Sequence, residues 1–241
     1  MKTTLAISLL VALGTASASA LAQDEPKRIL VFGDSLTWGW TPMDPITPTV
    51  RHPEADRWTT AMAEALGEGY AVEVDGLSGR TTNIDDPNDA KLNGADYLPS
   101  ALAAHEPLDL VVILLGTNDT KSYLERTPLE IGLGAGELLN IVDESPGWDW
   151  TDYPNPQTLL ISPPPLGAEI DPLAAEAFEG ALEKSERIPA VYRAIAEAAD
   201  EHFFDAGSVI STDGVDGVHF TAETNRTLGE AVATEVERIL D

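Results

Sequence analysis

The sequence of 241 residues contains no cysteine. This absence excludes disulfide bonds, thiol redox chemistry, thiolate metal sites and attachment of a lipid to an N-terminal cysteine. Hydrophobic residues make up 43% of the chain, which is enough at this length to bury a full core. We therefore expect the fold to depend on its core and on no covalent cross-link.

Basic residues are scarce. The chain has 14 lysines and arginines against 41 aspartates and glutamates, so its formal net charge is -27 at pH 7. A surface this acidic repels nucleic acid phosphates and anionic lipid head groups. We therefore expect no nucleic acid and no anionic membrane among the partners. The charge favours solubility in salty surroundings, where counterions screen the repulsion.

Long hydrophobic runs are also missing, apart from one stretch near the start. A short basic start is followed by an apolar stretch over residues 5–13 and by small residues over 16–22. This layout is typical of a secretory signal peptide cleaved before Leu21 or Gln23, the alternative being an uncleaved amphipathic leader. The apolar stretch is too short to span a membrane. The sequence thus predicts export to the periplasm or the medium, no membrane span, a signal peptide over residues 1–22 and a single domain over residues 23–241.

Motifs for nucleotides and metals are missing as well. Neither G-x-x-x-x-G-K-[ST] nor G-x-G-x-x-G after a strand occurs, which disfavours nucleotide binding. His52, His105 and His202 do not cluster with carboxylates at metal-ligand spacing, so we predict no metal and no cofactor and expect surface or capping roles for them. One acidic loop raises the question of calcium, but a solvated loop is the simpler interpretation of Asp85, Asp86 and Asp89.

Stretches typical of strands and helices alternate along the chain. Short apolar runs that end at glycine or proline predict strands, and the most apolar of them, residues 108–115, is expected at the centre of a parallel sheet. The alternation predicts an α/β fold, a three-layer α/β/α sandwich around a mostly parallel sheet. The predicted strands are 29–32, 70–74, 108–115, 158–162 and 203–205, and the predicted helices are 57–66, 95–105, 128–143, 186–202 and 221–240.

The first predicted strand runs directly into Gly33, Asp34 and Ser35. A strand that ends at a tight turn places Ser35 just past the carboxyl edge of the sheet, where open α/β folds bind their ligands. A serine hydroxyl is a poor nucleophile until an imidazole takes its proton, and that imidazole needs a carboxylate on its other nitrogen. Ser35 is therefore a candidate nucleophile if a base lies beside it.

Asp216 and His219 offer that carboxylate and that base. They are three residues apart, so in a helical turn their side chains share one face. Asp216 can then orient His219 and leave the far ring nitrogen for Ser35. Asp213 is the alternative carboxylate, but it lies six residues from His219 and would need a different turn. We favour Asp216.

Attack on an ester creates a negatively charged oxygen that donors already in place must stabilise. The backbone N–H of Ser35 is one candidate. Gly79 suits another, because a backbone without Cβ can approach a ligand closely. Asn118 offers a side-chain N–H at the end of the predicted central strand. Each motif alone is weak, but their order at successive strand ends predicts a serine hydrolase.

The four motifs resemble the four blocks of the SGNH (GDSL) hydrolases, whose places are taken in order by Ser35, Gly79, Asn118 and His219. The resemblance implies a flavodoxin-like sheet. It also implies a catalytic triad of Ser35, Asp216 and His219, with Ser35, Gly79 and Asn118 forming the oxyanion hole.

Most of the mature sequence is similar to a small bacterial branch of that family, the arylesterases and acyltransferases with perhydrolase activity. The predicted signal peptide departs from this branch, whose members are cytosolic, so the resemblance does not carry a location. The stretches that carry the likeness are residues 33–40, 80–87, 92–100, 116–121, 162–166 and 203–221.

This branch implies that the acyl group can pass to an alcohol or to hydrogen peroxide in competition with water. An apolar channel at the nucleophile would favour such acceptors, because it lowers local water and gives an organic acceptor surface to bury. We predict that Leu36, Trp38, Trp40, Ile84 and Leu166 form the substrate pocket. The alternative for the tryptophans is ordinary core packing.

Two loops, residues 81–100 and 148–156, are candidate lids or subunit contacts. In the resembling branch such insertions help to build a homo-oligomer with a narrowed entrance, so we expect oligomerisation here. The alternative is that both are solvated surface loops.

The sequence therefore predicts an exported serine esterase that acts on short-chain aryl or alkyl esters through an acyl-enzyme at Ser35, with acyl transfer as a second activity. Deacetylation of a carbohydrate by the same triad is the alternative within enzymes. A non-catalytic binding module is the alternative from another class, and the joint presence of Ser35, Asp216 and His219 counts against it.

Overall fold

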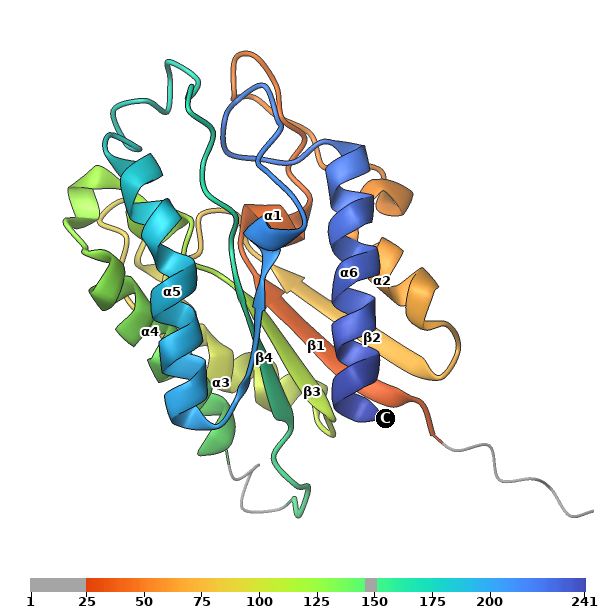
Figure 1. Cartoon of the computed structure of the whole chain (residues 1–241). Helices are drawn as coiled ribbons and strands as arrows, with labels where there is room; N and C mark the ends of the chain where they lie inside the picture. Colours follow the sequence, from red (N-terminus) through yellow and green to blue (C-terminus); the bar gives the residue numbers. More distant parts are fainter. Residues whose placement is uncertain (1–24, 146–150) are drawn as a thin grey trace, which may run out of the picture.

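The computed structural model describes residues 25–145 and 151–241. Its centre is a five-stranded sheet with the order β2-β1-β3-β4-β5, in which every pair of neighbours is parallel (Figure 1). This is the strand order of flavodoxin-like folds. The strands are β1 (Lys27–Gly33), β2 (Tyr70–Gly76), β3 (Leu110–Leu114), β4 (Gln157–Ser162) and β5 (His202–Asp205).

Helices cover both faces of this sheet (Figure 1). Two of them, α2 (Trp58–Leu66) and α6 (Ala222–Leu240), pack on one face. The other face is covered by α3 (Gly94–His105), α4 (Pro128–Asp143) and α5 (Ala181–Ala199). The predicted three-layer α/β/α sandwich is confirmed, and the predicted central strand is β3.

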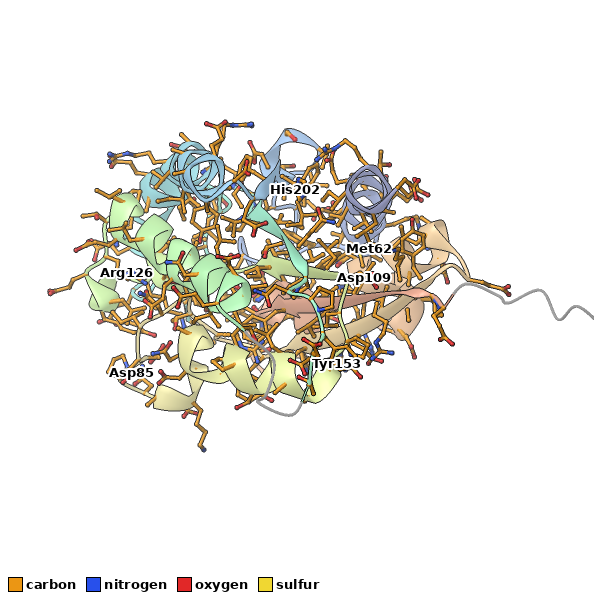
Figure 2. All side chains as sticks on the ribbon, turned by 90° about the horizontal axis from the view of Figure 1, so that it is seen from below. Met62, Asp85, Asp109, Arg126, Tyr153 and His202 are labelled. Atoms are coloured by element: carbon orange, nitrogen blue, oxygen red, sulfur yellow. The ribbon has the colours of Figure 1, made fainter. Side chains whose placement is uncertain are left out.

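Alternating side chains along β1 build the two halves of the core. Because successive residues of a strand point to opposite faces, Ile29 and Val31 join the cluster under α2 and α6. Leu30 and Phe32 join the cluster under α3, α4 and α5. Met62 of α2 is fully buried in the first cluster (Figure 2). β1 is therefore covered on both faces, which explains why its sequence is a continuous apolar run.

The register of the strands brings their carboxyl ends to one level. Gly33 at the end of β1 pairs with Gly76 of β2 and with Leu114 of β3. The chain leaves β1 toward β2 on one side, while β3 lies on the other side, so the loops after β1 and β3 separate. Open α/β sheets bind ligands in the crevice at such a switch point.

Most predicted elements match the structure to within two residues at each end, and the larger differences are in two places. The helix predicted over residues 186–202 spans Ala181–Ala199, and His202 lies in β5. Its true start follows Gly180, which makes no side-chain cap, so the sequence carried no capping signal there. A short helix, α1 (Ser35–Trp38), replaces the simple turn expected after β1.

Some predictions concern residues outside the described ranges. The predicted signal peptide over residues 1–22 lies there, and so do Trp148 and Trp150 of the second predicted lid. Among the helices of the described residues, none combines the length and apolar character needed to cross a membrane.

The contact between α2 and α6 gives a test of the packing. A Cβ on Gly229 of α6 would lie 2.3 Å from the carbonyl oxygen of Trp58 and 2.7 Å from Cβ of Ala61. We expect Gly229→Ala to lower the free energy of unfolding by about 1–3 kcal/mol in urea titrations, because the helices must move apart. In the matched control Gly136→Ala on α4, the new Cβ meets only Cγ2 of Ile195, at 3.0 Å. That variant should unfold like the wild type, and equal losses in both would contradict the packing argument.

Candidate active site

The first residues after β1 are held by a capped helix. Asp34 is the N-cap of α1, and its Oδ1 accepts a hydrogen bond from the Leu36 N–H at 2.9 Å. Ser35 follows as the first residue of α1 and is buried. The N–H of a first helical residue has no partner within its own helix, so it is available to a ligand.

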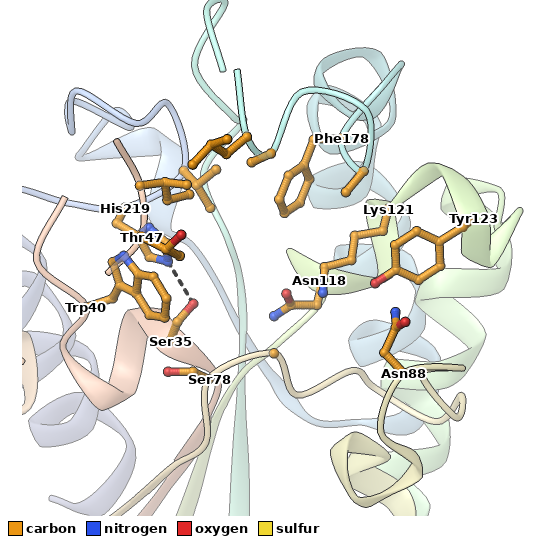
Figure 3. A pocket seen from close by; sticks show the side chains of 16 residues that line it. Ser35, Trp40, Thr47, Ser78, Asn88, Asn118, Lys121, Tyr123, Phe178 and His219 are labelled. Atoms are coloured by element: carbon orange, nitrogen blue, oxygen red, sulfur yellow. Dashed lines mark hydrogen bonds between the residues drawn. The ribbon is translucent and has the colours of Figure 1, made fainter. Parts of the chain in front are cut away.

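A relay of hydrogen bonds joins Ser35 to two residues near the C-terminus. Nε2 of His219 lies 2.9 Å from Oγ of Ser35, the contact drawn as a dashed line in Figure 3. Nδ1 of His219 lies 2.8 Å from Oδ2 of Asp216. Oδ1 of Asp216 accepts hydrogen bonds from the N–H groups of Val218 and His219, both at 2.9 Å. The short spacing of Asp216 and His219 thus brings them together as the sequence predicted.

Asp213, the alternative carboxylate, has a different partner. Its Oδ1 accepts the Thr221 N–H at 2.9 Å and its Oδ2 accepts the Thr221 hydroxyl at 2.5 Å. Thr221 is the N-cap of α6. Asp213 therefore fixes the start of that helix and leaves the imidazole to Asp216.

The surroundings of the relay favour a neutral imidazole beside an ionised carboxylate. Burial lowers the pKa of His219 below its ordinary value of 6.5, and the Asp216 carboxylate only partly offsets this. Burial by itself would raise the pKa of Asp216, but the hydrogen bonds and charge of His219 and the Val218 N–H lower it below 3.8. His219 is therefore free to accept a proton in the neutral pH range.

Trp40 packs against the other side of the relay. Its ring lies nearly parallel to the His219 imidazole, with the two centroids 4.9 Å apart and an angle of 12° between the planes. This contact leaves the imidazole little room to rotate away from Ser35.

Gly79 and Asn118 line the same cavity as Ser35 and His219. Gly79 has φ +88°, a left-handed conformation that favours glycine, and a Cβ there would lie 3.0 Å from Leu92. Within the described residues, no acceptor is bonded to its N–H. Nδ2 of Asn118 donates to Oδ2 of Asp34 and to the carbonyl of Arg80, both at 3.2 Å. Its two hydrogens are thus held by long bonds, one of which must be shared or released for Asn118 to serve an oxyanion.

Arg80 and Asp34 are supporting residues that the sequence reasoning did not assign. The Arg80 guanidinium is 1% exposed and donates to the carbonyls of Gly33 and Asp75, at 3.0 and 2.8 Å. It also forms a 2.8 Å salt bridge with Asp75. Its Cζ lies 4.0 Å from the centroid of the Phe32 ring. Asp34 is the neighbour of Ser35 and Arg80 is the neighbour of Gly79 in the sequence. This position inside the motifs was the only sequence signal for their supporting roles.

A cavity of about 470 Å³ opens above these groups. Ser35, Trp40, Gly79, Asn118 and His219 line it together (Figure 3). The remaining wall is formed by Ile46, Thr47, Ser78, Asn88, Lys121, Tyr123, Leu173, Ala174, Ala177, Phe178 and Val218.

The chain matches the model of the GDSL-like lipase/acylhydrolase family over residues 31–227. It belongs to this family. Among solved structures, the aryl esterase of M. smegmatis is 55% identical and Est24, a carbohydrate acetylesterase from Sinorhizobium meliloti, is 52% identical. Each gives a TM-score of 0.87 over 89% of this chain and 100% of the other. A putative arylesterase from Agrobacterium tumefaciens is 39% identical, with a TM-score of 0.79 over 89% and 100% of the two chains. The comparison with curated protein sequences finds no match.

Membership of this family decides between the two classes of protein that the sequence left open, an enzyme and a non-catalytic binding module. The chain is a carboxylic ester hydrolase of the GDSL/SGNH type, with relatives above 50% identity that include an aryl esterase. The resemblance stated from the motifs is confirmed, and the non-catalytic binding module is set aside.

The predicted substrate pocket needs correction. Of its five residues, only Trp40 lines the cavity. Leu36 faces the core under α2 and α6, and Leu166 is buried behind the cavity wall beside Phe178 and Val218. Trp38 packs against Arg51, whose Cζ lies 5.5 Å from the centroid of the Trp38 ring. The backbone carbonyl of Ile84 accepts a hydrogen bond from the Thr81 hydroxyl. Nearness in sequence to Ser35 or to a motif did not predict which way these side chains point.

Two other expectations are corrected by burial. His52 was expected to have a surface or capping role; it is buried rather than on the surface, with Nε2 3.0 Å from the carbonyl of Phe220, the residue after His219. Asp86 was expected in a solvated loop, but its side chain is 2% exposed. Asp85 and Asp89 are exposed as expected, and Asp85 lies at the edge of the molecule (Figure 2). In the described residues, no three His, Asp or Glu side chains are grouped as a metal site would require.

Asp34 gives the site a testable dependence on pH. Burial is the main cause that raises its pKa from 3.8 to about 7, against the opposing Leu36 N–H. The unfolded chain releases this proton near pH 4, whereas the folded chain keeps it to about pH 7. Stability contributed by the protonated group is therefore lost as pH rises through this window. Urea unfolding at about pH 5 and about pH 8 should show the wild type losing stability relative to Asp34→Asn. A stability difference that stays constant with pH would contradict the raised pKa.

Proposed function

We propose that this protein is a serine esterase that hydrolyses short-chain acyl esters through an acyl-enzyme at Ser35. The observation that carries the proposal is the relay of 2.9 and 2.8 Å hydrogen bonds from Ser35 through His219 to Asp216, placed on the wall of the cavity. The likeness to an aryl esterase and to a carbohydrate acetylesterase supports ester substrates of these kinds.

Acylation follows from the geometry of the relay. Oγ of Ser35 attacks the ester carbonyl carbon while Nε2 of His219 takes the hydroxyl proton. Asp216 holds the opposite ring nitrogen and stabilises the resulting imidazolium. When the tetrahedral intermediate collapses, the bond to the alcohol oxygen breaks and the proton passes from His219 to that oxygen. The alcohol leaves, and the acyl group remains on Ser35.

The negative oxygen of the intermediate is met by three donors. These are the N–H groups of Ser35 and Gly79 and the side-chain amide of Asn118, whose long bonds to Asp34 and Arg80 keep it oriented. The backbone donors need no reorganisation when the charge develops, whereas Asn118 must share or release one of these two bonds. The fold therefore holds two backbone donors ready for the oxyanion and keeps the Asn118 amide within reach.

Deacylation repeats these steps with a new acceptor. His219 takes a proton from water while the water oxygen bonds to the acyl carbon. The bond to Oγ of Ser35 then breaks, the proton passes from His219 back to Oγ, and the acid leaves. An alcohol or hydrogen peroxide in place of water gives an ester or a peracid. The apolar side chains of Trp40, Phe178 and Val218 at the cavity support acyl transfer, because they favour an organic acceptor over water.

A carbohydrate O-deacetylase is the second candidate. The likeness to Est24 favours it, together with the polar side chains of Lys121, Tyr123 and Asn88 on the cavity wall. The same triad and the same steps serve either substrate.

Two further proposals concern the setting of the reaction. The composition of residues 1–22 supports export of the mature protein, and the likeness of the chain to its branch supports a homo-oligomer. Small acyl esters and small acceptors are the partners we propose.

Turnover of p-nitrophenyl acetate by the wild type and by Ser35→Ala tests the function. We expect the variant to lose activity by about 10⁴-fold or more, because the acyl-enzyme cannot form. The exposed residue Ser208, outside the cavity, gives the matched control Ser208→Ala, which should keep the wild-type rate. With a primary alcohol present, the wild type should also release the acetate ester of that alcohol. Equal activity of wild type and Ser35→Ala would place the nucleophile elsewhere.

The lowered pKa of His219 predicts the pH dependence of the reaction. Only the neutral imidazole can take the proton of Ser35, so activity is lost as pH falls through this pKa. We expect the acid-side midpoint of kcat/KM to lie below 6.5. In Asp216→Asn the His219 pKa should fall further, since the carboxylate that raises it is gone, and kcat should drop by about 10⁴-fold. NMR titration of the imidazole measures the His219 pKa in the wild type and in Asp216→Asn. A pKa that is higher in the variant would contradict the assignment.

A further inference from the structure

The cavity has two chemically different faces. One face is apolar and comes largely from the segment before α5. Across the cavity from Ser35 and His219, Figure 3 shows the polar side chains of Asn88, Lys121 and Tyr123. The apolar face consists of Ile46, Leu173, Ala174, Ala177, Phe178 and Val218.

The polar face is organised by one buried carboxylate, Asp86. Its Oδ2 accepts the Tyr123 hydroxyl at 2.8 Å and lies 3.5 Å from Nζ of Lys121. Its Oδ1 accepts the backbone and side-chain N–H groups of Asn88, both at 2.9 Å. Three side chains from two separate loops are therefore fixed on a single 2% exposed group. Such a wall is held in place before any ligand arrives, which lowers the entropy lost on binding.

The charges on this face balance and its donors remain in place. Although burial alone would raise the pKa of Asp86, the bonds from Asn88 and Tyr123 and the charge of Lys121 lower it. Burial, followed by the bond to Asp86, raises the pKa of Tyr123 to about 12. An ionised Asp86 thus neutralises Lys121, and Tyr123 stays protonated. The ammonium has three hydrogens and the salt bridge uses one, so others remain for a ligand.

We propose that the face formed by Asn88, Lys121 and Tyr123 on Asp86 binds the alcohol part of the ester and selects alcohols with additional hydroxyl groups. Hydroxyls match a neutral wall with N–H donors, whereas an anion would meet the Asp86 carboxylate. The inference rests on the proposed function, because the acyl group there is short and carries no hydroxyl. Any hydroxyl that reaches this face must then belong to the alcohol.

The test compares two esters with the same acyl group. Glycerol monoacetate and propyl acetate both carry an acetyl group on a three-carbon alcohol and differ only in two hydroxyls. The quantity compared is kcat/KM for glycerol monoacetate divided by kcat/KM for propyl acetate. We expect Lys121→Met to lower this ratio by about tenfold relative to the wild type, because a charged donor to those hydroxyls is lost. Hydrolysis is followed by titration of the released acid.

Lys91→Met is the matched control, since Lys91 is exposed, does not line the cavity and undergoes the same change. It should leave the ratio at the wild-type value. An unchanged ratio in Lys121→Met, which means equal fold losses with both esters or no loss with either, would overturn the inference. If Lys121→Met does not fold by circular dichroism, Lys121→Gln and Tyr123→Phe decide the question. Lys121→Gln keeps a donor and should retain more of the ratio, while Tyr123→Phe should lower it by about fivefold.

Failure of the inference and failure of the proposed function give different results. The inference fails if the wild type and its Lys121 variants hydrolyse both esters with one common ratio. The proposed function fails if Ser35→Ala hydrolyses these esters as fast as the wild type.

Discussion

The side chain and carbonyl of Arg80 connect the parts from which the site is built. Its guanidinium binds the carbonyl at the end of β1, Gly33, and the carbonyl and carboxylate of Asp75 on β2. Its own carbonyl accepts from Asn118 after β3, and its chain neighbour is Gly79. The charge is buried between aromatic rings, where an unpaired cation would be costly. The guanidinium therefore ties the ends of β1 and β2 together, and the backbone carbonyl of the same residue ties the segment after β3 to them.

The sequence was sufficient for the features that local patterns control. The apolar runs of β1 and β3 predicted a parallel sheet, and the spacing of three between Asp216 and His219 predicted their contact because one turn of chain makes it. The residues that form the cavity wall could not be predicted from such local patterns. Phe178 and Tyr123 meet there only after distant loops pack, and no periodicity encodes that meeting. The same limit explains Leu36, which follows Ser35 directly but faces the core on the other side of a short helix that was not predicted.

The excess of acidic groups outside contrasts with careful pairing inside. The chain carries a formal charge of -27, yet its buried carboxylates each have specific partners. Asp119 is bonded to Arg126 at 2.6 Å and to the hydroxyl and N–H of Thr82. Asp216 has His219, and Asp34 has the N–H groups of Leu36 and Asn118. Of these three buried carboxylates only Asp119 is paired with a cation, and the other two are held by N–H donors, so hydrogen bonds offset part of the cost of burial.

The stack of Trp40 on His219 has an electrostatic consequence. An aromatic ring carries negative charge density on its faces, so it attracts a cation that lies above it. In the proposed mechanism His219 becomes cationic each time it takes a proton, and the indole face is already 4.9 Å away. Such contacts contribute about 0.5–2 kcal/mol, depending on how far water is excluded. The face of Trp40 can therefore stabilise the imidazolium where solvent is excluded.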